Sequence, residues 1–173
     1  SEHTGSSGEW GHGINISGST NVTIKDVEIS QCWGDGIYLG FYDGPNICSD
    51  GVTIENCNLH HNRRNNLSIT DVSNVTVRNC RFDNAKGTDP QFGIDIEPNN
   101  GRPCKNIKIY DSTFTGNAKA SMGIMTTASD ITIENCTMSG HFYNWAGKNV
   151  VIKNTTIKGD IVDHIPGNLT IIE

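Results

Sequence analysis

The chain has 173 residues, of which 19 are glycine and 7% are aromatic, and its formal net charge is −6. This length fits one domain, and we expect residues 1–173 to form a single domain cut from a longer protein. The acidic balance excludes nucleic acid as an expected partner, because neutralising phosphates takes a basic surface. No apolar run is long enough to cross a membrane, so no membrane partner is expected either.

One sequence motif recurs, with substitutions, along nearly the whole chain. Its strongest form is glycine, then hydrophobic–variable–hydrophobic, a polar stretch, and Asn-Val-Thr-Ile followed by another short apolar pattern. In chain order the copies begin at Gly13, Gly36, Asn66, Gly93 and Gly123, with a weaker copy at Asn149. A motif of constant length at variable spacing indicates stacked coils with strands of fixed length, joined by loops of different size.

Apolar and polar residues alternate within each copy, which is the pattern of half-buried strands. In the first copy the expected strands lie around residues 14–16, 22–24 and 27–29. No sustained helical period is present. We therefore predict an all-β, right-handed parallel β-helix of about five to six coils, since a parallel crossover takes the right hand.

Two columns of this stack can be predicted directly. One position of the repeat holds asparagine or aspartate, which accept left-handed backbone geometry and bond neighbouring backbone. Its members are Asp26, Asn56, Asn79, Asp111, Asn135 and Asn154. The next position holds the small residues Val27, Cys57, Cys80, Ser112, Cys136 and Thr155. We expect its three cysteines to be buried free thiols, although adjacent coils are close enough for disulfides.

The sharpest chemical feature is a pair of acids on one predicted strand. Asp95 and Glu97 are two residues apart, so both project from the same face, about 7 Å apart at Cα. Their carboxyl groups then fall about 5 to 9 Å apart, the span used by paired acids in glycoside hydrolysis. Asp35, before the corresponding strand of another coil, is a third catalytic candidate. The alternative is that these acids are ordinary solvated surface groups.

Candidate substrate-binding residues surround this face. Arg63 and Arg64 precede the strand one coil from Asp95 and suit an anionic substrate. Their alternative role is ion pairing with Asp95, Asp71 or Asp83.

Aromatic residues are expected on the same face. Trp10 and Trp33 occupy matching positions one coil apart and, with Tyr38, offer ring faces to sugars. The alternative is that both tryptophans are buried under loops. His12 is a candidate acid or base, or else a surface hydrogen-bonding group. The long loops 41–51 and 98–104 are expected to wall a groove beside Asp95.

We expect no metal site and no cofactor. No cysteine or histidine spacing indicates zinc. Asp43, Asp50 and Asp71 offer carboxylates to a calcium ion, but their spacing is not diagnostic.

The segments WGDGIYLG, NRRNNLSI and GTDPQFGIDIEPN resemble the pectate-lyase-like β-helix superfamily, and more narrowly the β-helix domains of phage tailspikes and preneck appendages. This resemblance runs from Gly8 to Glu134. It implies an extracellular or virion-associated protein that binds and cleaves an anionic polysaccharide or teichoic acid, with Asp95 and Glu97 as its acids. The Asn-Thr-Asp, Asp-Asp and Arg-Ile-Lys set of polygalacturonases and the Asp-Pro-His motif of alginate epimerases are absent.

Three functions remain open at this point. The first is a glycan-cleaving enzyme, the second a non-catalytic glycan-binding shaft or adhesin, and the third a secreted polysaccharide lyase or epimerase. The first coil shows no cap, and solenoids need capped ends. Together with the resemblance, this predicts a homotrimer or flanking domains.

Overall fold

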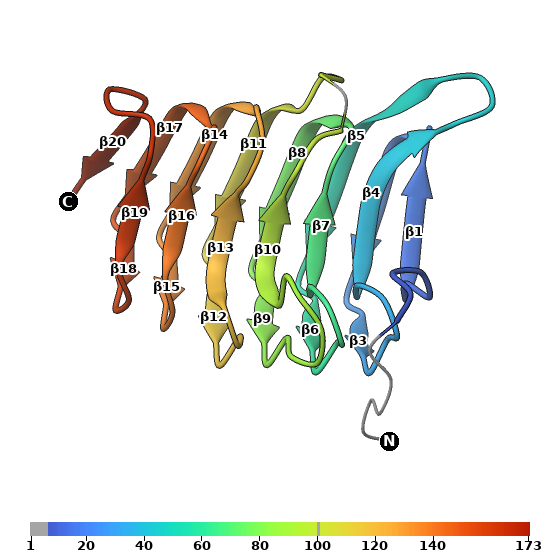
Figure 1. Cartoon of the computed structure of the whole chain (residues 1–173), viewed down its shortest axis with the longest axis horizontal. Helices are drawn as coiled ribbons and strands as arrows, with labels where there is room; N and C mark the ends of the chain where they lie inside the picture. The colour runs from blue at the N-terminus through green and yellow to red at the C-terminus, as the bar shows by residue number, and fades with distance from the viewer. Residues whose placement is uncertain (1–6, 100) are drawn as a thin grey trace.

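A computed structural model describes residues 7–99 and 101–173, and within these ranges all regular structure is β-strand. The strands form three parallel sheets that wind around one core (Figure 1). The first sheet contains β1 (Ile14–Ser17), β4 (Ile37–Tyr42), β7 (Leu67–Ile69), β10 (Phe92–Ile96), β13 (Ala120–Ile124), β16 (Phe142–Asn144) and β19 (Ile161–Asp163).

The second sheet contains β2 (Thr20–Lys25), β5 (Ile47–Glu55), β8 (Val72–Arg78), β11 (Lys105–Tyr110), β14 (Ser129–Glu134), β17 (Lys148–Lys153) and β20 (Leu169–Ile172). The third sheet contains β3 (Glu28–Ser30), β6 (Asn58–His60), β9 (Arg81–Asp83), β12 (Thr113–Thr115), β15 (Thr137–Met138) and β18 (Thr156–Ile157). No helix in the described part of the chain is long and apolar enough to cross a membrane.

Each coil gives one strand to each sheet, and successive coils pair in parallel. In the first sheet, for example, Ile37 pairs with Leu67, which pairs with Ile94. The third sheet has six strands, so the described residues form six coils that reach all three sheets. The predicted parallel β-helix and its number of coils are therefore confirmed.

One hairpin interrupts the regular winding. The ends of β4 and β5 pair in antiparallel fashion, with Phe41 opposite Cys48 and Tyr42 opposite Ile47. In Figure 1 this hairpin projects beyond the coils at the end of the solenoid nearer the N-terminus. It forms one wall of the site described below.

The core consists of columns of apolar side chains that point inward. One column of the second sheet is Ile24, Ile54, Val77, Ile109, Ile133 and Ile152, each paired with the next coil. All six side chains are buried. Truncating Ile109 to alanine would leave a cavity that neighbouring coils cannot close, at a cost of about 2–5 kcal/mol.

The predicted asparagine column is confirmed as a turn ladder. Its six residues have positive φ angles between 44° and 57°. Neighbouring amides bond along the column, as in Asn79 Nδ2 donating to Asn56 Oδ1 at 3.1 Å. A second ladder, which the sequence reasoning missed, contains Asn21, Asn74, Asn106, Asp130 and Asn149. Its signal was the asparagine or aspartate that opens most copies of the Asn-Val-Thr-Ile pattern, with Gly51 at this position in the second copy.

The small-residue column points inward, as predicted. Cys57, Cys80, Ser112 and Cys136 are buried, and all six cysteines are free thiols.

The fifth repeat copy has a different register from the one its glycine suggests. Matching Gly123 to Gly93 would put Met125 beside Asp95. In the structure Gly123 itself pairs with Asp95. Shifting a strand by two residues keeps every apolar side chain on its side, so alternation alone cannot distinguish the two registers.

Candidate functional site

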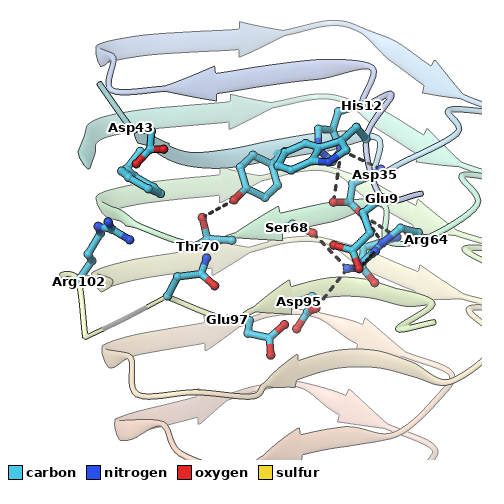
Figure 2. A pocket seen from close by; sticks show the side chains of 15 residues that line it. Glu9, His12, Asp35, Asp43, Arg64, Ser68, Thr70, Asp95, Glu97 and Arg102 are labelled. Carbon is cyan, nitrogen blue, oxygen red and sulfur yellow. Dashed lines mark hydrogen bonds and ion pairs between the residues drawn. The ribbon is translucent and has the colours of Figure 1, made fainter. Parts of the chain in front are cut away.

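A pocket of about 400 Å³ opens on the outer face of the first sheet, over β4, β7 and β10 (Figure 2). Of the residues predicted for the site, seven line it: Trp10, His12, Asp35, Tyr38, Arg64, Asp95 and Glu97. The other lining residues are Glu9, Phe41, Asp43, Asn65, Ser68, Thr70, Asn99 and Arg102. Arg63 and Trp33 are not among them.

Asp95 is a buried carboxyl group in the middle of β10. Its residue is only 3% exposed, because the pocket walls and neighbouring coils cover it. Oδ2 accepts a hydrogen bond from Asn65 Nδ2 at 3.2 Å, whereas Oδ1 has no partner among the described residues. Burial, followed by the negative charges of Glu97 and Asp35, raises the pKa of Asp95 to about 8. Asp95 therefore carries a proton at neutral pH and can act as an acid.

Glu97 follows β10 on the same face and is exposed. Its backbone N–H donates to Ile69 O at 3.0 Å, which continues the pairing with β7. Figure 2 shows its carboxyl group on the same side of the strand as that of Asp95. A buried neutral acid beside an exposed carboxylate is the separation of environments that general acid–base chemistry needs. The main cause of the raised Asp95 pKa is burial, and the charge of Glu97 comes second.

Asn65 connects the acids of two other coils, and sequence reasoning did not select it. Its backbone N–H donates to Asp35 Oδ1 at 3.0 Å, and its Nδ2 donates to Asp95 Oδ2 and to Ser68 Oγ. Its Oδ1 accepts the N–H of Phe92 at 2.9 Å. Every polar group of this buried side chain is thus used, which fixes the position of Asp95. The signal was its place in the column of residues that precede the strands.

Asp35 belongs to a network at one end of the pocket. Its N–H donates to His12 Nδ1 at 3.0 Å, so the neutral imidazole carries its proton on Nε2. Arg64 contacts Glu9 at 3.1 Å and Asp35 at 3.8 Å. Burial raises the pKa of Asp35 and lowers that of His12. These contacts hold His12 and Arg64 in place, and the catalytic role predicted for Asp35 stays a prediction.

Two aromatic rings pack around His12. Tyr38 stacks on the imidazole with ring centroids 4.8 Å apart, and Trp10 approaches it edge-on at 5.8 Å. Trp10 is 70% exposed and lines the pocket, so its ring is available to a ligand.

The predicted substrate contact of Arg63 is wrong, because its side chain is fully buried. Nε donates to Trp33 O at 2.6 Å, Nη1 donates to Thr88 Oγ1 at 2.8 Å, and Nη2 donates to Gly8 O. The guanidinium lies 4.3 Å from the centre of the Trp33 ring. Arg63 ties loops together, and the Trp33 ring covers it outside the pocket. Trp33 does not line this pocket, but it is 39% exposed, so its predicted contact with a sugar stays a prediction.

The opposite end of the pocket is formed by the two long loops, as predicted. Phe41 and Asp43 come from the β4–β5 hairpin, and Asn99 and Arg102 come from the loop after β10, whose Asn100 lies outside the described residues. The Arg102 guanidinium lies 3.5 Å from the centre of the Phe41 ring. Its nearest acid, Asp71, is 3.8 Å away. Arg102 is a pocket cation that sequence reasoning missed, although it lies in a loop already linked to the acids.

Two of the three aspartates considered for calcium have other partners. Asp71 Oδ1 accepts the N–H of Asn99 at 2.7 Å, and Asp50 Oδ1 accepts Asn74 Nδ2 on the second sheet. Across residues 7–99 and 101–173, no three histidine, cysteine, aspartate or glutamate side chains are grouped to hold a metal ion.

Comparison with known proteins finds a matching family and several similar proteins. The family model described as "Right handed beta helix region" matches residues 6–138. The chain is 39% identical over 126 residues to the uncharacterized protein YclG of Bacillus subtilis (strain 168), covering 66% of this chain and 22% of YclG. It is 27% identical over 155 residues to a polygalacturonase of Cochliobolus carbonum, covering 84% of this chain and 40% of that protein. The chain thus spans less than half the length of these relatives.

Two solved structures share the fold. The A-module of the Azotobacter vinelandii mannuronan C-5 epimerase AlgE6 superposes with a TM-score of 0.68 at 10% identity, over 94% of this chain and 47% of that one. The tailspike gp49 of Acinetobacter baumannii bacteriophage Fri1, a capsular polysaccharide depolymerase, gives a TM-score of 0.51 at 17% identity, over 93% and 35%.

Proposed function

Because this chain belongs to the right-handed β-helix family, we propose that its pocket cleaves the glycosidic bonds of a polysaccharide. The observation that carries the proposal is Asp95, a buried carboxyl group with a pKa raised to about 8, two residues from the exposed Glu97. Polysaccharides are the substrates named for the polygalacturonase relative and for the tailspike depolymerase, which supports a glycan in this pocket.

The two acids divide the reaction between them. Asp95 donates its proton to the glycosidic oxygen as the bond from that oxygen to the anomeric carbon breaks. Glu97, as a carboxylate, either attacks the anomeric carbon or takes a proton from the attacking water. One water molecule is consumed, and both acids return to their starting states. Trp10 and Tyr38 offer ring faces to the sugar units on either side of the bond.

The substrate in this proposal is an anionic cell-surface polysaccharide or a teichoic acid. Support comes from arginines at both ends of the pocket, Arg64 and Arg102 (Figure 2). Arg64 is held between Glu9 and Asp35, whereas the ion pair of Arg102 with Asp71 is long, at 3.8 Å. Arg102 is therefore the better candidate for an anionic substituent, in the role first assigned to Arg63.

The protein is proposed to act outside the cell or on a virion, as a homotrimer or with flanking domains. Light scattering over a wide concentration range measures association, and a stable monomer throughout would count against the trimer.

Elimination by a lyase is the second candidate, favoured by the neutral His12 imidazole beside the pocket. Burial lowers the pKa of His12, so the ring is uncharged at neutral pH. Its Nδ1 accepts the Asp35 N–H, so His12 would take a substrate proton only by giving up that hydrogen bond. A lyase product is unsaturated and absorbs ultraviolet light, whereas hydrolysis gives reducing ends without that absorbance.

The experiment is to incubate the protein with polygalacturonate, polymannuronate, poly(glycerol phosphate) teichoic acid and a neutral glucan. Reducing ends, phosphate release and ultraviolet absorbance are followed together. We expect cleavage of at least one polymer and a loss of about a hundredfold or more in turnover for Asp95→Asn and Glu97→Gln. Glu134→Gln, on β14 of the second sheet, is the matched control. Equal turnover in Asp95→Asn and the control would refute the assignment.

A further inference from the structure

The columns that carry the two pocket acids continue onto the next coils of the first sheet. Asp95 pairs with Gly123, and Gly123 pairs with Tyr143. In the adjacent column Glu97 is followed by Met125 and then by Trp145. Two backbone hydrogen bonds of 2.9 Å show this register: Met125 N–H donates to Ile96 O, and Trp145 N–H donates to Ile124 O. The acid pair is therefore matched, two coils further on, by an aromatic pair.

Both aromatic rings are held in place by other rings. Trp145 is 48% exposed and stacks on His164 with centroids 4.2 Å apart at 27°. Tyr143 stacks on His141 at 5.9 Å and contacts the Phe92 ring at 6.1 Å. A single exposed aromatic residue needs no explanation. Two adjacent, supported rings in line with the acids form a rigid surface, which loses little freedom when a ligand binds.

The surface between the acids and this aromatic pair is apolar. Gly123 has no side chain, and a Cβ there would come within 2.7 Å of the Phe92 ring and 3.0 Å of Met125 Sδ. Phe92 and Met125 thus occupy the space above Gly123 and form a floor between Asp95 and Tyr143. Two inter-coil spacings separate the acids from the aromatic pair, which is about 10 Å.

We propose that Tyr143 and Trp145 form a second carbohydrate-binding site, which holds sugar units of the same polymer that occupies the pocket. The C–H faces of pyranose rings pack on aromatic faces, and the polar edge supplied by His141 and Asp160 is available to sugar hydroxyl groups. The polymer then runs along the solenoid axis, from the acids toward the C-terminal coils. This inference rests on the proposed function for the identity of the ligand.

Binding by chains of different length tests the second site. The probes are the di- and octasaccharides of galacturonate, mannuronate and N-acetylglucosamine, titrated by calorimetry into protein carrying Asp95→Asn so that no cleavage intervenes. We expect Trp145→Ala and Tyr143→Ala to weaken octasaccharide binding about five- to tenfold. Disaccharide binding should be unchanged. Trp145→Phe keeps a ring and should restore most of the affinity.

Tyr110→Ala is the matched control, since Tyr110 ends β11 on the second sheet. Thermal melts establish that each variant is folded. Octasaccharide affinity that is the same in both alanine variants and the control would overturn the second site, and so would an equal loss for both chain lengths. Octasaccharide binding that depends on Trp145 would support the second site. If the unaltered protein also cleaves none of the octasaccharides, the second site would stand and the proposed catalysis would be refuted. No octasaccharide binding at all would overturn both.

Discussion

Asn65 donates its side-chain amide to the carboxyl group of Asp95 at 3.2 Å, across a separation of 30 residues in the sequence. The same residue donates its backbone N–H to Asp35, which lies another 30 residues away on the other side. Parallel stacking places Asp35 and Asn65 at the same position of successive coils, and Asp95 on the next coil lies opposite Ser68, three residues further along the repeat. The pocket acids are therefore organised across coils, and their environments depend on the register between β4, β7 and β10.

The first prediction concerns the pH dependence of turnover. Since Asp95 must be protonated to act as an acid, kcat/KM should fall as the pH rises through about 8. The Asn65 hydrogen bond lowers the pKa of Asp95, so Asn65→Ala should move this alkaline limb to higher pH. Thr70→Val is the control, because Thr70 lines the pocket but bonds Tyr38 and Leu39. A limb that is the same in all three proteins would contradict the acid role of Asp95.

The second prediction concerns stability. The folded protein binds the Asp95 proton up to about pH 8, whereas the ordinary pKa of an aspartate is 3.8. Asp95 therefore favours the folded state at pH below about 4, and this contribution is lost as the pH rises toward 8. Asparagine is neutral at every pH. The free energy of unfolding of Asp95→Asn, taken relative to that of the unaltered protein, should therefore increase as the pH rises from 4 to 8. Urea denaturation at several pH values measures the difference, and a constant difference would contradict the raised pKa.

Local patterns predicted the fold and part of the site. Alternation and the recurring asparagine fixed the strands, the ladder and the inward cysteines, because these features depend on the residues of one coil. Alternation also placed Asp95 and Glu97 on the outer face. Each of these predictions needed only the period of the strand.

Features that depend on contacts between coils and loops were beyond these patterns. Arg63 and Arg64 are adjacent and chemically identical, yet one is buried against loop carbonyls and the other lines the pocket. Nothing local distinguishes them. The register predicted for β13 was wrong for a related reason, because a shift of two residues preserves the alternation of apolar and polar side chains. Asn65 and Arg102 were missed because their roles arise from partners in other coils.

The third prediction concerns the cysteines. Cys57, Cys80 and Cys136 are buried, and burial raises the pKa of Cys80 and of Cys136 to about 11. Because the thiolate is the reactive form, these three should not react with Ellman's reagent in the native protein. The half-buried Cys32 and Cys48 should react first, and denaturant should expose all six. Rapid native labelling of the three buried thiols would contradict the inward column.

The fourth prediction contrasts Arg63 with Arg102, which replaces Arg63 as the candidate contact to an anionic substrate. Arg63→Ala should lower the free energy of unfolding by about 3 kcal/mol or more, because it removes the buried hydrogen bonds to Trp33 O, Thr88 Oγ1 and Gly8 O and opens a void. Arg63→Lys should restore little of it, since an ammonium group cannot reproduce the fork of a guanidinium. Denaturant titration measures both variants. Full stability of Arg63→Ala would contradict its structural role.

Arg102→Ala is the other half of the contrast. The Arg102 side chain is 22% exposed and its contact with the buried Asp71 is long, at 3.8 Å, so its loss should lower the free energy of unfolding by less than the loss of Arg63 does. Removing the guanidinium from the pocket should instead weaken the binding of polygalacturonate or teichoic acid and reduce the dependence of that binding on salt, while a neutral glucan is unaffected. Calorimetry at two salt concentrations separates these effects. Equal weakening for charged and neutral polymers would mean that Arg102 shapes the pocket wall through Phe41 and does not recognise charge.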